Sequence, residues 1–308
     1  MREAKCGIED QGDIEEYLGV NVMRNSEGIH LTQPHLIDQI INNVHLSDTA
    51  PSKIVTPAAS MVILSEDPNG KPFDYDFDYC SVVGKLNFLE KSTQPNIAYA
   101  VHQCAQFCLR PKKSHGGTII HLVKYLRETR NKGIQRSPNK DKGLEVYADA
   151  DFAGAWKKSE AELEANTAKS RTGYLIQYAG GMLTWKSKMQ TIIALSSTEA
   201  EYVVLSQSMR EAIPIIGLLD ELRDWKMVPE PTKTSIKCKA FEDNLGAIEL
   251  AKLPKMRPRT KHINISYHHF RSFITNGSVS VVPISTKEQV ADLLTKPFPQ
   301  NRFLKLRN

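Results

Sequence analysis

Acidic side chains stand at positions in this sequence where a solvated charge has little reason to lie. Asp149 and Asp151 follow an apolar segment, and residues i and i+2 of a strand share one face. Asp243 follows another apolar segment and opens a helical pattern. Like charges placed close together repel unless a cation lies between them, and hard divalent cations prefer carboxylate oxygens. Four acids at strand ends and on packed helices, Asp149, Glu199, Asp243 and Asp292, are therefore candidates to converge into an oxygen-ligand site for Mg²⁺.

The same acids also have plain structural interpretations. Asp243 stands where it could cap the N-terminus of the helix that follows. Ser196-x-x-Glu199 and Thr198-x-x-Glu201 both have the spacing of a capping box, so either glutamate could serve the helix terminus. Spacing alone leaves both interpretations open.

The elements that must position these acids follow from the hydrophobic pattern after residue 143. The expected strands are Leu144–Tyr147, Gly173–Tyr178, Met182–Ser187, Ser235–Phe241 and Val279–Ile284. The expected helices are Thr198–Arg223 with an interruption near Pro214, Asn244–Lys252, Ile263–Thr275 and Lys287–Thr295. Three strands followed by alternating helix and strand predict an α/β fold, a mixed five-stranded sheet with flanking helices.

A smaller, mostly helical region is expected to precede that sheet. The pattern predicts a hairpin from Glu16–Arg24 and Gly28–Thr32, then an irregular stretch over residues 47–78. The expected helices are Gln33–Val44, Tyr79–Ser92, Asn96–Leu109 and Thr118–Thr129. Residues 131–143 are polar and contain Gly133, Pro138 and Gly143, so we predict two domains, 1–138 and 139–308.

Composition excludes several classes of protein. Of 308 residues, 41% are hydrophobic and 24% charged, which suits a folded chain rather than a disordered one. No stretch approaches the roughly 20 apolar residues that a membrane helix needs, and the N-terminus lacks the apolar core of a signal peptide. The five cysteines include no CxxC pair, which indicates a reducing compartment. We therefore expect no membrane partner and no secretion.

The basic residues are concentrated in one block. Residues 103–138 carry eight Lys or Arg side chains against Glu128 alone, whereas residues 1–102 carry 7 basic and 15 acidic ones. Residues 250–287 contain no acid and form a second basic segment. Such blocks suit a polyanion, although a solvated helix face is the plain alternative. The candidate nucleic-acid contacts are Lys112, Lys113, Lys124, Arg127, Arg130, Lys255, Arg257, Arg259, Lys261, His262 and Arg271.

Several strings of the sequence together resemble one family. YADADFAG, SRTGYLIQYAGGMLTWKSKMQ, ALSSTEAEYVVL, EDNLGAIELA, RTKHINISYHHFR and VADLLTKPF are similar to the ribonuclease H domain of copia-type retrotransposon Pol polyproteins. Upstream, YLGVNV, LTQPHLIDQII, YCSVVGKLNFL and QPNIAYAVHQCAQF resemble the thumb and connection part of the reverse transcriptase in the same polyproteins. The resemblance covers roughly residues 7–298 in order.

This resemblance implies a ribonuclease H-like fold and metal-dependent endonucleolytic hydrolysis of the RNA strand of RNA–DNA hybrids. The resemblance also implies that acidic residues hold two Mg²⁺ ions, with Mn²⁺ as a substitute, and two cations about 4 Å apart stabilise an in-line displacement. By the family match, Asp149, Glu199, Asp243 and Asp292 are the catalytic and metal-binding residues. Asp151 belongs to a signature of the family and is a weaker candidate ligand. The alternative is that Asp151 is an acid in a loop with no role in metal binding.

Glu199 and Glu201 are expected to differ in role. Their side chains lie about 200° apart around a helix axis, since each residue turns about 100°. Only one of the two glutamates can therefore face the strand ends that carry Asp149 and Asp243. The family match favours Glu199 at the metal and Glu201 as the capping partner of Thr198.

The resemblance does not extend to the polymerase palm. No YxDD motif between apolar residues precedes Tyr17, so we expect no DNA polymerase activity from this chain. The expected partners are an RNA–DNA hybrid or duplex and the palm and fingers of the same polyprotein, in a cytoplasmic virus-like particle or the nucleus. The alternative is a non-catalytic, nucleic-acid-binding relic of a transposon.

Overall fold

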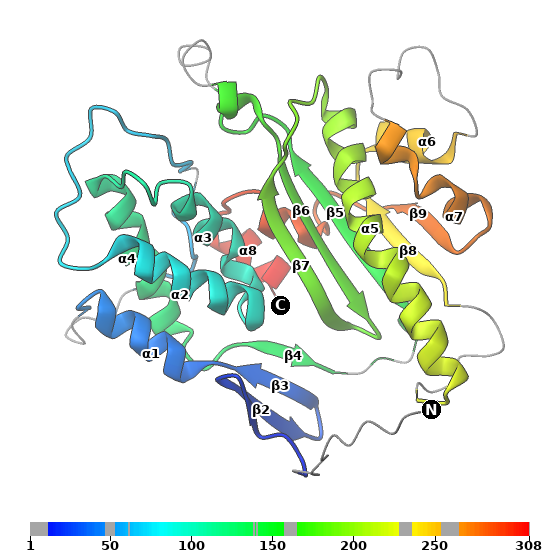
Figure 1. Ribbon diagram of the computed structural model, residues 1–308, viewed down its shortest axis with the longest axis horizontal. Helices are drawn as coiled ribbons and strands as arrows, with labels where there is room; N and C mark the ends of the chain where they lie inside the picture. Colours follow the sequence, from blue (N-terminus) through cyan, green and yellow to red (C-terminus); the bar gives the residue numbers. More distant parts are fainter. Residues whose placement is uncertain are drawn as a thin grey trace, which may run out of the picture.

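The molecule consists of two β-sheets and the helices that accompany them (Figure 1). The computed structural model describes residues 12–46, 53–60, 62–137, 139, 141–156, 165–227, 236–253 and 265–307. No helix within these ranges is long and apolar enough to cross a lipid bilayer.

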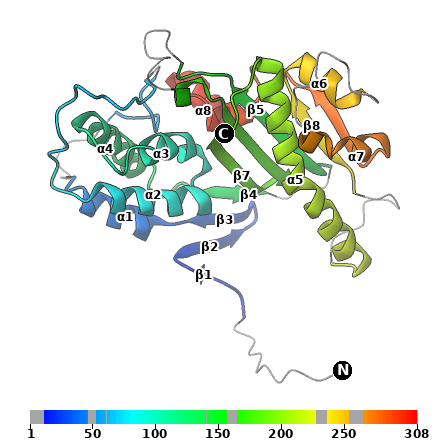
Figure 2. The same cartoon turned by 45° about the horizontal axis from the view of Figure 1, so that its top comes forward.

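The first sheet is antiparallel and has the order β1-β2-β3-β4. Its strands are β1 (Glu16–Tyr17), β2 (Val20–Asn25), β3 (Gly28–Thr32) and β4 (Ile134–Arg136). The helices of this region are α1 (Pro34–Asn43), α2 (Tyr79–Ser92), the 3-10 helix η1 (Pro95–Ile97), α3 (Ala98–Ala105) and α4 (Lys113–Glu128). The predicted hairpin and helices are confirmed, and Figure 2 shows β1–β3 extending below α1 and α2.

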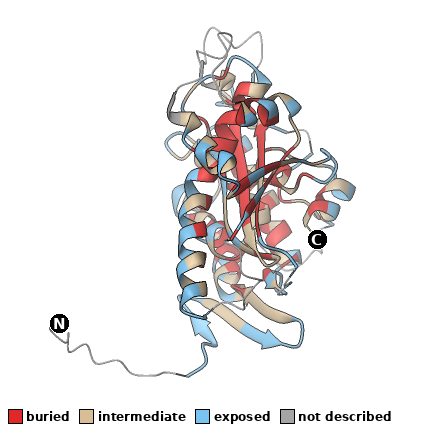
Figure 3. Cartoon of the chain, turned by 90° about the vertical axis from the view of Figure 1, so that its right-hand side faces the viewer, coloured by how far each residue is buried: buried red, intermediate tan, exposed pale blue. Residues whose placement is uncertain are grey.

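The second sheet has five strands in the order β7-β6-β5-β8-β9. They are β5 (Leu144–Asp151), β6 (Arg171–Tyr178), β7 (Gly181–Met189), β8 (Cys238–Glu242) and β9 (Val279–Pro283). β5–β6 and β6–β7 pair antiparallel, whereas β5–β8 and β8–β9 pair parallel. The predicted mixed five-stranded sheet is confirmed, and its central strands are buried (Figure 3).

Helix α5 (Ser197–Asp224) covers one face of this sheet, where alternate residues of β5 such as Val146 and Ala148 join its core. The expected interruption at Pro214 is wrong, since α5 is continuous through it. Proline removes one backbone donor. Pro214 and Arg210 are both exposed, so water can reach the carbonyl that the missing donor leaves. Helices α6 (Leu245–Lys252), η4 (Ile265–His268) and α7 (Arg271–Thr275) complete this side.

The opposite face of the sheet packs against the last elements of the chain and against the first region. The segment expected as a final α-helix is the 3-10 helix η5 (Val290–Leu294), and α8 (Gln300–Arg307) follows it. Leu175 of β6 packs with Leu294 and with Ala98 of α3. Phe303 of α8 lies in the hydrophobic core formed by α1–α4.

The first sheet ends with β4 at Arg136, and the second sheet begins with β5 at Leu144. Helix α8, at the end of the chain, nevertheless packs with the helices of the first region. A hydrogen bond also joins the two parts: the Trp185 indole N–H donates to the Glu90 carbonyl at 2.9 Å. The division into domains 1–138 and 139–308 stays a prediction.

Candidate metal centre

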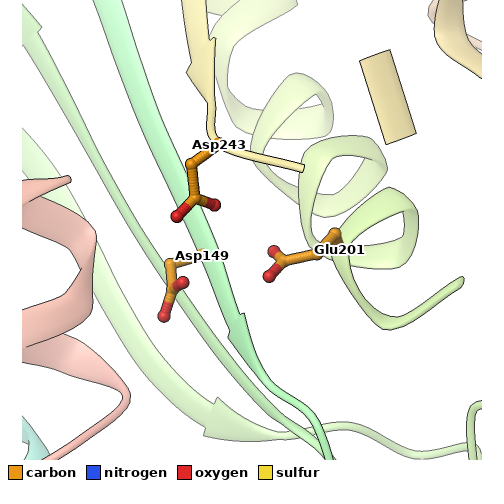
Figure 4. A group of neighbouring side chains, drawn as sticks. All are labelled: Asp149, Glu201 and Asp243. Carbon is orange, nitrogen blue, oxygen red and sulfur yellow. The ribbon is translucent and has the colours of Figure 1, made fainter. Parts of the chain in front are cut away.

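Three carboxylates meet where the central strands β5 and β8 separate. The parallel pairing of these strands ends at Tyr147 and Phe241, and Asp149 and Asp243 each lie two residues further along. Glu201 reaches the same point from the N-terminal part of α5 (Figure 4). One oxygen from each of the three carboxylates lies within 4.8 Å of the others. Three anionic oxygens at this spacing suit a hard divalent cation.

The start of α5 decides which glutamate faces the sheet. Ser196 caps the helix, and its hydroxyl accepts the backbone N–H of Glu199 at 3.1 Å. The Glu199 carboxylate reaches back and accepts the backbone N–H of Leu195 at 2.7 Å. Glu199 therefore serves the N-terminus of α5, with its carboxylate bonded to the residue before the N-cap Ser196. Glu201, two residues further, points toward β5, where it accepts the N–H of Ala150 at 2.7 Å.

This geometry differs from the sequence prediction for both glutamates. The prediction put Glu199 with Asp149 and Asp243, and Glu201 at the cap of Thr198. The structure brings Glu201, not Glu199, to the carboxylate group. The physical reason is the start of the helix: Ser196 is its N-cap, and the Glu199 carboxylate bonds back to the Leu195 N–H at that end of α5.

Burial is the largest influence on the pKa values of Asp149 and Glu201. It raises the pKa of Asp149, although the Lys296 ammonium opposes the shift. Burial also raises the pKa of Glu201, and the carboxylates of Glu242 and Asp149 add to the effect. Negative charges confined in this way are stabilised by a cation between them, so the group fits a divalent ion by both ligand type and charge.

Asp292 is buried on η5 but does not join the group of three. Lys296 Nζ lies 2.8 Å from Asp292 Oδ1 and 3.3 Å from Asp149 Oδ1. Arg302 Nη2 lies 2.5 Å from the other Asp292 oxygen. The structure thus places Asp292 beside Asp149 with a lysine between them, and pairs both of its carboxylate oxygens with basic side chains.

A glycine lets η5 approach Asp149 this closely. Gly173 of β6 lies directly opposite Asp149 in the sheet. A Cβ atom at Gly173 would come within 2.5 Å of Thr295 Cγ2 and 3.0 Å of the Ala291 carbonyl oxygen. Any side chain there would push η5 away, and with it Thr295, whose hydroxyl donates a hydrogen bond to Asp149 Oδ2.

Glu242 is a further buried acid that the sequence analysis missed. Its Oε1 accepts the N–H of Asn244 at 3.0 Å, while Oε2 is buried without a hydrogen-bond partner among the described residues. Burial raises its pKa to about 8, and the charge of Asp243 adds to that shift. The available signal was the alternation of β8, which places Cys238, Ala240 and Glu242 on one buried face.

Asp151, the weaker candidate, ends β5 opposite Arg171. The strand continues through Asp151, beyond its predicted end at Tyr147, because β6 keeps pairing with it. Burial raises the pKa of Asp151, against the attraction of Lys296 and Arg171. Asp151 is not part of the group of three carboxylates.

Several candidate nucleic-acid contacts on α4 or next to its ends are paired with acids or carbonyls. Lys113 lies 2.6 Å from Asp74, Arg127 contacts Glu128, and Arg130 pairs with Asp38. The Lys112 ammonium donates to the Gly70 carbonyl at 3.5 Å. Lys124 is half-buried on the same helix. Acidic neighbours therefore reduce the positive charge of this block.

Residues 250–253 and 265–287 of the second basic segment are described. Arg271 opens α7 and donates to the hydroxyl of Tyr202 at 3.1 Å and to the Leu250 carbonyl at 2.7 Å. This side chain therefore ties α7 to α5 and α6. Outside the described residues lie the candidates Lys255, Arg257, Arg259, Lys261 and His262.

Comparison with known proteins adds relatives along almost the whole chain. It is 32% identical over 303 residues to the retrovirus-related Pol polyprotein from transposon TNT 1-94 of Nicotiana tabacum, covering 96% of this chain and 21% of the relative. It is 32% identical over 299 residues to that from transposon RE1 of Arabidopsis thaliana, covering 97% of this chain and 19% of the relative. Among solved structures, LC11-RNase H1, isolated from compost, matches 54% of this chain and 99% of its own, with a TM-score of 0.34 and 14% identity. No family model matches the chain.

Proposed function

We propose that this chain, which belongs to the Pol polyproteins of copia-type retrotransposons and spans about a fifth of their length, hydrolyses the RNA strand of RNA–DNA hybrids with divalent metal ions. The observation that carries the proposal is the group of Asp149, Glu201 and Asp243, the first two of them buried, at the point where β5 and β8 separate. Lys296 is the basic side chain paired with Asp149, and carboxylates this close together are costly for the fold unless further positive charge balances them.

Asp149, Glu201 and Asp243 would hold Mg²⁺, with Mn²⁺ as a substitute. When bound, the metal would stabilise charge on the phosphate and make water a better nucleophile. The chain's own groups fix the ligands beforehand: the Ala150 N–H orients Glu201 and the Thr295 hydroxyl orients Asp149. For a second ion, Asp292 would have to exchange its contact with Lys296 for the metal.

Substrate selectivity tests the proposal. The purified chain with Mg²⁺ is expected to cut the RNA strand of a labelled RNA–DNA hybrid, to leave the DNA strand intact, and to cut single-stranded RNA little. Equal cleavage of single-stranded RNA would indicate a contaminating ribonuclease or a different substrate class, and would contradict the proposal.

A second candidate function is that of a non-catalytic relic that binds nucleic acid. The observation that favours it is Asp292, because Lys296 and Arg302 occupy both of its carboxylate oxygens. Under this alternative, the chain binds hybrids but leaves both strands whole at every Mg²⁺ or Mn²⁺ concentration.

Lys296→Met is expected to lower the melting temperature in EDTA, because Asp149 and Asp292 then lose the ammonium between them. Saturating Mg²⁺ should raise the melting temperature of the variant more than that of the parent. Lys113→Met is the matched control, since its exposed pair with Asp74 contributes little. Thermal melts of the three proteins with and without Mg²⁺ measure this. Equal Mg²⁺-induced shifts in parent and Lys296→Met would contradict the role given to Lys296.

The affinity for a duplex should fall as the salt concentration rises, because basic residues on and just after α4 contact phosphates. Each phosphate contact adds about −0.9 to the log–log slope of affinity against salt for a B-form duplex. Changing Lys124, Arg127 and Arg130 to Glu should flatten that slope. The control with the same change in net charge alters Lys226, Lys237 and Lys239, which lie toward the opposite end of the sheet from Asp243. An unchanged slope in the α4 variant would show that this block is a solvated face.

These 308 residues are also expected to give no primer extension with any template, because they contain no YxDD motif. A palm and fingers from the same polyprotein would supply that activity, in a cytoplasmic particle or in the nucleus. Template-directed extension by a clean preparation would overturn this expectation.

A further inference from the structure

Gln289 is a fully buried side chain whose amide joins three segments of the chain. Its Nε2 donates to the carbonyl of Ala148 at 2.8 Å and to that of Phe241 at 3.4 Å. Its Oε1 accepts the N–H of Ala291 at 3.3 Å and so caps η5. One amide thereby binds β5, β8 and η5 together.

Each of these segments carries an acid of the site. Ala148 immediately precedes Asp149, and Phe241 lies two residues before Asp243. Ala291 immediately precedes Asp292. The amide therefore sits at the point where the pairing of β5 and β8 ends, and it donates to a carbonyl on each of the two separating strands.

We propose that Gln289 is a positioning residue that fixes the distance between the strand ends bearing Asp149 and Asp243 and holds η5 against them. This rests on the proposed function, since it concerns the metal that the same carboxylates would bind. Like charges at the two strand ends repel, and the strands have no ladder hydrogen bonds between them beyond Tyr147 and Phe241. A hydrogen-bonded link across the gap opposes their separation.

The expected consequence is a change in metal affinity. Groups that orient metal ligands commonly change metal affinity or activity by about 10–100-fold when they are replaced. Gln289 differs from an ordinary buried glutamine because its partners adjoin three different acids. Its loss should therefore affect metal binding and kcat, while KM for the hybrid stays unchanged because no substrate-facing charge is altered.

The test uses Gln289→Met, which keeps the length of the side chain and removes its hydrogen bonds. The matched control is Gln94→Met: Gln94 is also buried and its Nε2 donates to the Lys132 carbonyl at 2.5 Å, in the first region. Calorimetric titration with Mg²⁺, without nucleic acid, is expected to show about 10–100-fold weaker binding by Gln289→Met and parent-like binding by Gln94→Met. Melting temperatures in EDTA should fall in both variants.

Gln289→Asn provides a second measurement if the methionine variant folds poorly. Its shorter amide cannot reach both strand carbonyls at once, so its Mg²⁺ affinity should fall between those of the parent and Gln289→Met. Parent-like Mg²⁺ affinity in both Gln289 variants would overturn the positioning role while leaving the proposed function intact. A parent chain that binds neither Mg²⁺ nor Mn²⁺ would instead contradict the proposed function, and the positioning role with it.

Discussion

Glu201→Gln is expected to abolish cleavage of the hybrid, whereas Glu199→Gln should keep nearly parental activity. The Glu201 carboxylate lies with Asp149 and Asp243, while the Glu199 carboxylate accepts the N–H of Leu195. Glutamine at position 201 keeps the shape but removes a negative charge that the metal needs. Glutamine at position 199 can still accept the hydrogen bond. Rates with a labelled hybrid, measured for both variants in one buffer, test the difference.

Thermal melts separate the two roles further. Glu201→Gln should leave the melting temperature in EDTA level or raise it, because burial and neighbouring acids already disfavour the charged Glu201. Glu199→Ala should lower stability by on the order of 1 kcal/mol through loss of the capping partner. If Glu199→Gln stops cleavage and Glu201→Gln does not, α5 has been assigned to the wrong face.

Asp149→Asn and Asp243→Asn should each lower the hydrolysis rate by at least about a hundredfold, because even residues behind the ligands of a metal commonly contribute 10–100-fold. Each substitution removes one of three anionic oxygens held within 4.8 Å of one another. Asp224→Asn, at the far end of α5, is the control and should cut at the parental rate. Single-turnover cleavage measures the three variants. Parental rates in both site variants would show that another group of residues performs the hydrolysis.

Two of the three grouped carboxylates could be predicted from the sequence. Asp149 and Asp243 stand out because each lies in or just after an apolar strand, and parallel strands bring such positions to one edge of the sheet. The order of strands and helices likewise follows from hydrophobic periodicity. These features depend on local pattern, which the sequence carries directly.

The choice between Glu199 and Glu201 could not be made in this way. Both fit a capping box, and both have buried neighbours at helical spacing along α5. Only the residue at which the helix starts decides which glutamate faces β5. In the structure that residue is Ser196, whose hydroxyl accepts the N–H of Glu199, and the spacing at Thr198 fitted a cap equally well.

The surroundings of Asp292 depend on long-range packing. Arg302, which pairs with it, lies on α8, and α8 is held in place by Phe303 in the core of the first region. The Gln289 amide likewise donates a hydrogen bond to the carbonyl of Ala148, which lies 141 positions away in the sequence. Contacts of this range have no periodic signature, so the sequence could nominate Asp292 but not its partners.

The rate of RNA-strand cleavage in an RNA–DNA hybrid, as a function of Mg²⁺ concentration, tests the assignment of a metal-dependent hydrolase most directly. We expect no cleavage in EDTA, a rate that rises with Mg²⁺ and saturates, and recovery when Mg²⁺ is restored after EDTA. Asp149→Asn, purified in the same way, sets the background. A folded chain that binds the hybrid but leaves its RNA whole at every Mg²⁺ and Mn²⁺ concentration would contradict the assignment and favour the non-catalytic relic.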